Sequence, residues 1–418
     1  MIPIAMPTLL KLKRWSWYGF EIGNHAHALM VSTVGFALYF RQYLFADNPR
    51  ADSMWGLLTA IVLAISALVS PFFTSWLSLR NLRWLGLFLT TIACVAATLA
   101  LGTDSSAWTA VVFYVVSALG YYVALPIYTT YINEVSGDRM DQVSARGWAY
   151  GYVGGLLVAL IAFKLGLLSH PVRERPDLFR DIFLLAGLFN LAFSLPMLLW
   201  TAVSEIRTPL PRIDVLRWNP RRVLDIFSEA PTLFRLLCSY WMIGECATIT
   251  IYFTAIFLAQ YAHMNAGRIF EMTLLVQLIA TFSTWFAGDL AVRYGPKCVY
   301  RGVCVLWISV PIFLFLISVG VTYWIAMVLI GLVLGVHHAI IRSEVAKITT
   351  ISFHNIESRG SVFGFLEVAG RITSVFGPLL VALVGWFLPL SYTLLVACIF
   401  PILALIFISK YKWIQSAY

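Results

Sequence analysis

Residues 204–231 read SEIRTPLPRIDVLRWNPRRVLDIFSEAP and form the longest polar stretch of the chain. This stretch contains Pro209, Pro211 and Pro220 together with five arginines, and such a composition is typical of a loop. The chain as a whole is apolar: of its 418 residues, 60% are hydrophobic and 12% are charged, and the mean hydropathy is +0.84. We therefore expect a protein that lies mostly in a lipid bilayer and is divided in two by its polar middle.

Apolar windows flank the polar stretch, six before it and six after it. A helix needs about 20 apolar residues to cross a hydrocarbon core roughly 30 Å thick. The sequence therefore predicts an all-α polytopic membrane protein with twelve transmembrane helices in two six-helix bundles, residues 1–203 and 232–418, joined by a basic cytoplasmic linker at 204–231. The windows are 17–44, 54–77, 82–102, 107–134, 145–168, 180–203, 234–261, 268–291, 299–319, 322–348, 360–387 and 389–409.

The basic residues indicate how the chain is oriented. The formal net charge is +9, but the lysines and arginines sit in short loops between apolar windows, where they determine topology rather than bind nucleic acid. Most of the 29 lysines and arginines fall on one side if the N-terminus is cytoplasmic. We expect both termini in the cytoplasm, the lipid bilayer as the surrounding partner, no nucleic-acid partner, and a bacterial inner membrane location.

A glycine pattern opens the fifth window. Residues 146–155 read RGWAYGYVGG, and Gly147, Gly151 and Gly155 recur every four residues. Small residues on one helical face let a neighbouring backbone approach closely, so we expect tight helix packing here. The same glycines can also supply flexibility for alternating access.

Several motifs occur in both halves of the chain. They are GWAYGYVGG at 147–155 after Val143-Ser144, FEIGNHAH at 20–27, Arg342-Ser343, FGF at 363–365, Gly370-Arg371 and Gly377-Pro378. Together these motifs resemble the vacuole-effluxer-like (unknown major facilitator type 1) branch of the major facilitator superfamily. The branch has different residues at His25, His27 and Ile341, namely a small polar residue, an aromatic residue and a serine. The resemblance implies the major facilitator fold, in which spans 1, 4, 7 and 10 line a central cavity.

Residues 288–297, GDLAVRYGPK, resemble the cytoplasmic loop signature of the superfamily, with Val292 where an aspartate is usual. A tight glycine turn presents Arg293 and Lys297 towards helix C-terminal carbonyls and acidic groups. Two roles are open for this loop: a conformational latch and a simple loop brace. Arg342, Glu344 and Lys347 are expected to snorkel to the interface or to form a gate with Glu134. The expected gate or latch residues are Glu21, Glu134, Asp289, Arg293, Lys297 and Arg342.

Ionisable side chains inside the apolar windows form the candidate site, because such groups are costly in a bilayer and usually mark a substrate or proton path. A helical rise of about 1.5 Å per residue places most of them near the midplane. Glu21 is closer to the interface, beside Trp17 and Tyr18, so its role is open between cavity and structure. The expected substrate- or proton-binding residues are Glu245, Arg371, His25, His27, Asn24, His337, His338, Glu367, Tyr121 and Tyr122.

Glu245 is expected to carry a proton or pair with a cationic group, because burial favours the neutral carboxyl. The alternative is a hydrogen-bonded glutamate that only packs helices. Arg371 can hold a carboxylate or phosphate, and Glu367, four residues earlier, is well placed for a helical salt bridge with it.

The histidines are expected to be proton-sensitive cavity groups, since imidazole titrates near pH 6.5. His25 and His27 point about 200° apart on a helix, so they cannot easily bind one metal ion together. A metal site would need His337 or His338 to converge with an acidic group. The six cysteines form no C-x-x-C pattern, and neither a metal site nor a cofactor is expected.

No catalytic triad, phosphate-binding loop or metalloprotease helix occurs in the sequence, so we expect neither an enzyme nor a primary pump. The sequence predicts a secondary active transporter that moves a small polar solute by alternating access, coupled to protons, and acts as a monomer. An amino acid is favoured because Arg371 and Glu245 suit a carboxylate and an amine, and because the resembled branch is named for vacuolar amino-acid efflux. Two alternatives remain: a transporter-fold sensor or scaffold without turnover, and a lipid or amphiphile translocator.

Overall fold

The structure is a computed structural model, and it divides into two compact units. Unit 1 comprises the described residues of 1–135, 150–220 and 359–364, and unit 2 those of 136–149, 221–358 and 365–418. Every regular element in the described ranges is a helix. The described residues are 5–33, 35–48, 50–103, 105–168, 174–207, 225–228, 230–261, 266–316, 322–352, 356–385, 387 and 390–413.

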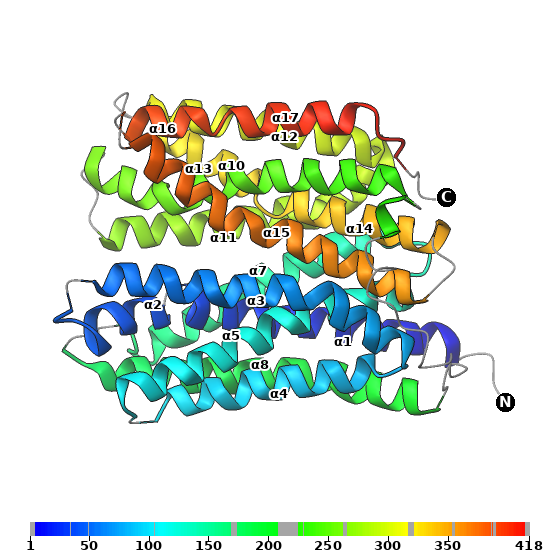
Figure 1. Cartoon of the computed structure of the whole chain (residues 1–418), viewed down its shortest axis with the longest axis horizontal. Helices are drawn as coiled ribbons and strands as arrows, with labels where there is room; N and C mark the ends of the chain where they lie inside the picture. The colour runs from blue at the N-terminus through cyan, green and yellow to red at the C-terminus, as the bar shows by residue number, and fades with distance from the viewer. Residues whose placement is uncertain are drawn as a thin grey trace. The chain divides into compact units, whose positions relative to one another are not determined.

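Unit 1 is built from the helices of the first half of the chain (Figure 1). Within it α4 packs against α5 and α8, and α1 packs along α8. Its elements are α1 (Ala5–His27), η1 (Ala28–Thr33), α2 (Gly35–Tyr39), η2 (Phe40–Leu44), α3 (Ala51–Leu79), α4 (Arg83–Leu101), α5 (Ala107–Thr130), α6 (Ile132–Val135), α8 (Pro176–Arg207) and the later part of α7 (Met140–Lys164).

Unit 2 contains the first turns of α7 and the helices of the second half. Within it α10 packs against α17 and α12, and α11 against α13. Its further elements are α10 (Pro231–Tyr261), α11 (Ala266–Tyr294), α12 (Pro296–Phe315), α13 (Thr322–Val333), α14 (Val336–Ile351), α16 (Leu390–Val396), α17 (Ile399–Ser409) and α15 (Ile356–Gly385) except for residues 359–364, which belong to unit 1.

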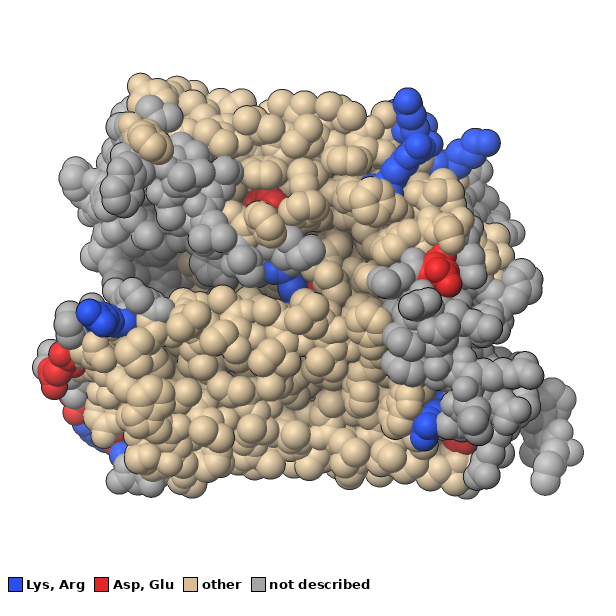
Figure 2. Space-filling model, viewed as in Figure 1, with Lys and Arg blue, Asp and Glu red and all other residues tan. Residues whose placement is uncertain are grey.

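The described part of each of the twelve apolar windows is mostly helical, which confirms the all-α polytopic fold class. Helices satisfy the backbone within one segment, as lipid requires. Among the described residues, eight helices are long and apolar enough to cross a membrane. Large apolar side chains such as Leu57, Leu68 and Phe163 are more than 60% exposed on them, as expected of surfaces that face lipid. On the face drawn in Figure 2, most charged side chains lie towards the helix ends.

Several of the predicted spans are interrupted within the described residues, and two of these breaks concern the candidate site. The first window changes from α-helix to the π-helical η1 directly after His27, and the tenth is divided into α13 and α14 at Leu334 and Gly335. Both breaks lie at or beside predicted site histidines. At the predicted linker, α8 continues to Arg207, while residues 208–224 and 229 lie outside the described part.

The glycine face of α7 packs against α1 within unit 1. A Cβ on Gly154 would collide with the backbone of Ile22, and one on Gly151 would collide with the His25 ring. The expected tight packing is therefore confirmed, although Gly154, rather than Gly155, makes the closest backbone approach. This contact brings α7 directly against the histidine-bearing turn of α1.

Candidate functional site

Glu245 of α10 is buried, with 1% of its surface exposed. The indole Nε1 of Trp241, one turn earlier, donates a hydrogen bond of 2.6 Å to Glu245 Oε1. Burial of a carboxylate is costly unless it is hydrogen-bonded, paired or protonated. The indole therefore orients one oxygen of the carboxyl group and partly replaces its lost hydration.

Arg371 of α15 lies at the same level of unit 2 as Glu245. The hydroxyl of Thr248 donates to that of Thr373 at 3.2 Å, and Gly244 faces the Thr373 methyl group, so α10 and α15 pack together here. Arg371 is 6% exposed, and its Nη2 lies 3.4 Å from Glu367 Oε2. The predicted helical ion pair is thus present, within two residues of the α10–α15 contact.

His337 and His338 of α14 are adjacent to the same part of α10. Their ring centroids are 3.9 Å apart. The His338 Nδ1 and the Tyr240 hydroxyl of α10 are hydrogen-bonded at 2.6 Å, and the indole of Trp148 stacks on His338 at 4.6 Å. His337 is fully buried, whereas His338 is half-buried. Unit 2 therefore gathers aromatic and imidazole rings from α7, α10 and α14.

In unit 1, His25 is paired with Glu21 one turn earlier. The His25 Nδ1 lies 3.6 Å from Glu21 Oε2, and the Tyr152 ring of α7 packs at 5.6 Å from the His25 ring. Glu21 is 2% exposed and Asn24 is 3% exposed. Both residues therefore lie in the interior of unit 1, and the choice for Glu21 between a cavity role and a structural role stays a prediction.

His27 points in a different direction from His25. Its Nε2 is 2.9 Å from the Ser117 hydroxyl of α5, and its ring stacks on Tyr121 at 5.1 Å. Tyr121 in turn meets Tyr122 edge to face at 5.0 Å. The two histidines of the H-x-H sequence thus face different helices, as the helical angle predicts.

A buried ion network joins the start of α7 to α14 in unit 2. Asp141 accepts a hydrogen bond of 2.8 Å from Lys347 Nζ and a further one from the Ser343 hydroxyl. Lys347 also lies 3.5 Å from Glu344 Oε2, and the hydroxyl of Tyr411 donates to Glu344 Oε1 at 3.0 Å. Asp141 and Glu344 are at most 1% exposed. Side chains of α7, of α14 and of Tyr411 are therefore held in one buried cluster.

Arg342, Glu344 and Lys347 do not snorkel, which corrects that expectation. Arg342 is 5% exposed and donates to the Ser144 carbonyl oxygen at 2.7 Å. The structure gives Lys347 the acidic partner Asp141. Buried cations need such partners because solvation is lost, and α7 supplies them.

The predicted loop signature contributes one residue, Asp289, to this region. Asp289 of α11 accepts a hydrogen bond of 2.6 Å from Gln142, and Arg146 lies 3.8 Å from the same carboxylate. Gly295 has φ of +85°, which forms the expected tight turn. Arg293 and Lys297 are exposed. Asp289 therefore joins α7 to α11, and its role as latch or brace stays a prediction.

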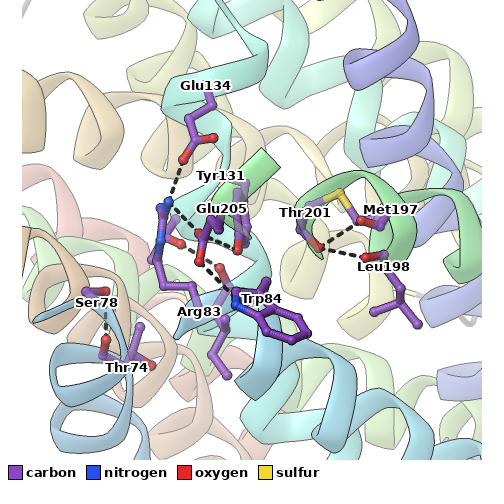
Figure 3. Close-up of polar contacts among 12 residues, drawn as sticks. Thr74, Ser78, Arg83, Trp84, Tyr131, Glu134, Met197, Leu198, Thr201 and Glu205 are labelled. Atoms are coloured by element: carbon purple, nitrogen blue, oxygen red, sulfur yellow. Dashed lines mark hydrogen bonds and ion pairs between the residues drawn. The ribbon is translucent and has the colours of Figure 1, made fainter. Parts of the chain in front are cut away.

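Glu134 belongs to a separate network in unit 1 (Figure 3). Arg83 Nη2 lies 2.7 Å from Glu134 Oε1 and 2.8 Å from Glu205 Oε1. Glu205 also accepts hydrogen bonds from the Tyr131 hydroxyl at 2.8 Å and from the Trp84 backbone at 3.3 Å. One arginine thus joins the ends of α4, α6 and α8.

The family model of the Major Facilitator Superfamily matches residues 56–378. The chain belongs to the Major Facilitator Superfamily. A curated relative, the uncharacterized MFS-type transporter YxiO of Bacillus subtilis (strain 168), is 24% identical over 380 residues, which cover 88% of this chain and 87% of YxiO.

Solved structures of several transporters share this fold. The proton:xylose symporter XylE bound to 6-bromo-6-deoxy-D-glucose aligns with a TM-score of 0.75 at 12% identity, over 98% of this chain and 97% of XylE. A bacterial homologue of the iron transporter ferroportin in its outward-facing state aligns with a TM-score of 0.69 at 15% identity, over 96% of this chain and 99% of the homologue. The human organic anion transporter MFSD10 aligns with a TM-score of 0.68 at 16% identity, over 95% of this chain and 99% of MFSD10.

Members of the Major Facilitator Superfamily are carriers. The chain is therefore an integral multi-pass membrane transporter that binds small-molecule substrates, and it is not an enzyme. Within the described ranges, no three histidine, cysteine, aspartate or glutamate side chains group as metal ligands.

Sequence reasoning missed four residues of the networks described above: Asp141 and Trp148 in unit 2, and Ser117 and Glu205 in unit 1. Asp141 and Glu205 stand at helix ends, where a charged residue ordinarily belongs to a solvated loop. Trp148 lay inside the glycine motif, and Ser117 is a single hydroxyl in an apolar window. Only a systematic count of polar residues inside the windows would have singled out Ser117.

Proposed function

We propose that this member of the Major Facilitator Superfamily is a secondary active transporter of a small polar solute, with an amino acid favoured, and that transport is coupled to protons through Glu245. One observation carries the proposal: a buried carboxyl group, Glu245, and a buried guanidinium group, Arg371, come from the same level of two packed helices. The transporter works by alternating access, as the major facilitator fold allows.

The two groups are complementary to an amino acid. A guanidinium group can hold a carboxylate through two parallel hydrogen bonds, and a buried carboxylate is stabilised by an ammonium group. Arg371 therefore receives the solute carboxylate, and Glu245 receives its amine. The opposite charges of the solute offset the desolvation of both side chains.

Proton coupling follows from the same burial. A carboxyl group that is 1% exposed is costly as an anion unless a cation or donor compensates it. Either a proton or the ammonium group of the solute can neutralise Glu245. Solute and proton therefore exchange at one carboxyl group, and this exchange links their movements.

We also propose that both termini are cytoplasmic, that the protein resides in the bacterial inner membrane, and that it acts as a monomer of two six-helix bundles, residues 1–203 and 232–418, joined at 204–231. Most lysines and arginines lie in the loops on the side assigned to the termini, as the positive-inside rule requires. The curated relative is bacterial.

The test is uptake of radiolabelled amino acids into proteoliposomes. Wild type is expected to catalyse uptake of at least one amino acid, and Arg371→Lys is expected to raise KM about tenfold or more, because the bidentate geometry is lost. The matched control is Arg41→Lys, because Arg41 is exposed. Uptake that Arg371→Lys leaves at the wild-type KM would reject the assigned role.

A further inference from the structure

A chain of buried hydroxyl groups leads from His27 into the interior of unit 1. His27 Nε2 is 2.9 Å from Ser117 Oγ, and Ser117 Oγ is 2.7 Å from Thr98 Oγ1. Thr98 Oγ1 is in turn 2.7 Å from the carbonyl oxygen of Cys94. His27, Ser117 and Thr98 are all fully buried. These hydrogen bonds connect α1 through α5 to α4.

Counting protons along this chain fixes the direction of every hydrogen bond. The Cys94 carbonyl oxygen can only accept a hydrogen bond, so Thr98 must donate its single hydroxyl proton to that oxygen. The contact between Thr98 and Ser117 then needs the Ser117 proton. Ser117 has none left for His27, so the proton of the remaining contact comes from His27 Nε2.

This tautomer leaves the lone pair of the His27 ring on Nδ1. Nδ1 is buried, and among the described residues it has no hydrogen-bond partner. Two other histidines differ from His27: the Nδ1 atoms of His25 and His337 lie 3.1 and 3.2 Å from backbone carbonyl oxygens one turn earlier. A buried acceptor that is left unsatisfied is costly, so its retention needs an explanation.

This series of hydroxyl groups cannot conduct protons beyond Thr98, because it ends on a carbonyl oxygen that has no proton to pass on. It orients His27 instead. The ring is covered on one face by Tyr121, which is half-buried. His27 is also the last residue of α1 before the π-helical η1, and π-helical turns frequently occur at functional sites.

We propose that His27 Nδ1 is a neutral hydrogen-bond acceptor for a side-chain hydroxyl or amide of the transported amino acid, and that Ser117 and Thr98 are positioning residues that fix its tautomer. This inference rests on the proposed transport function. A neutral imidazole is complementary to a neutral donor, whereas the charged amine of the solute requires an opposite charge. It assigns polar side chains such as those of serine and glutamine to the substrate class.

The positioning role is tested first without transport. In protein labelled with ¹⁵N-histidine, the signal of His27 is identified by its loss in His27→Gln, and its ring nitrogens report the tautomer. We expect the Nε2–H form in wild type. Ser117→Ala should shift the tautomer ratio about five- to tenfold, as expected for one hydrogen bond. Ser117→Thr, which keeps a hydroxyl, should restore the ratio.

The recognition role is tested with radiolabelled serine and alanine in proteoliposomes. Ser117→Ala should raise KM for serine about five- to tenfold while KM for alanine and both kcat values stay within about twofold. The matched control is Ser66→Ala, because Ser66 is also buried in unit 1 but donates to its own helix at Leu63 O. Ser66→Ala should leave both KM values unchanged.

The outcomes separate this inference from the transport proposal. A wild-type His27 that carries its proton on Nδ1, or on both nitrogens, overturns the inference even if serine is transported. An Nε2–H tautomer with equal KM changes for serine and alanine overturns the recognition role. Wild type that transports no amino acid overturns the proposed function and with it the solute role of His27, whereas the tautomer measurement still decides the hydroxyl chain.

Discussion

The buried pair of Asp141 and Lys347 gives the sharpest stability prediction. Their side chains are 0% and 7% exposed, and the N–O distance is 2.8 Å. Lys347→Met removes the cation and leaves the carboxylates of Asp141 and Glu344 buried without it. Breaking a buried ion pair in this way costs about 3–5 kcal/mol, and we expect the free energy of unfolding to fall by that amount.

Asp141→Asn is expected to cost less in the wild-type background, about 1–3 kcal/mol, because Lys347 keeps Glu344 at 3.5 Å. In the Lys347→Met background, the effect of Asp141→Asn on the free energy of unfolding should have the opposite sign. There Asp141 has lost the lysine that neutralises its charge, so converting it to a neutral amide should recover about 1–3 kcal/mol.

The assay is equilibrium unfolding in mixed micelles with a denaturing detergent, applied to the four proteins of this cycle. Lys297→Met serves as the control, since Lys297 is exposed, and it should change stability by less than about 0.5 kcal/mol. The reasoning is refuted if Lys347→Met behaves like this control, or if Asp141→Asn destabilises both backgrounds equally.

Two further substitutions test packing and the C-terminal contact. Burial, with the Glu344 carboxylate adding to it, raises the pKa of Tyr411 above its usual value, so the Tyr411 hydroxyl remains a hydrogen-bond donor at neutral pH. Tyr411→Phe should therefore lower the free energy of unfolding by about 1–3 kcal/mol. An unchanged free energy of unfolding in the same assay would contradict this prediction. Gly154→Ala should destabilise the protein by about 1–3 kcal/mol, because the new methyl group collides with the Ile22 backbone. The control is Gly56→Ala, whose methyl group meets open space and should stabilise the protein by up to about 1 kcal/mol. Equal effects of the two substitutions would refute the packing argument.

The helices were predictable because lipid imposes one solution on an apolar segment about 20 residues long. The pair of Glu367 and Arg371, and the opposite directions of His25 and His27, followed from helical geometry alone. Each depends only on residues within about one turn of each other. Such local relations do not depend on how the rest of the chain folds.

The partners of Asp141 and Glu205 were not predictable. Asp141 and Lys347 are separated by 206 residues, and no local pattern encodes a contact at that distance. Both acidic residues stand at helix ends, where sequence favours a solvated loop. The α-to-π change after His27 was missed as well, because hydropathy registers the apolar character of a window but not its hydrogen-bond pattern.

The central claim is that solute and proton exchange at Glu245, and proton release on solute binding tests it most directly. Purified transporter in weakly buffered detergent solution is mixed with a transported amino acid while a pH indicator is monitored. The account predicts that wild type and Glu174→Gln, a control at an exposed glutamate, release protons, and that Glu245→Gln binds the solute without releasing any. Equal proton release from Glu245→Gln and wild type would contradict the account.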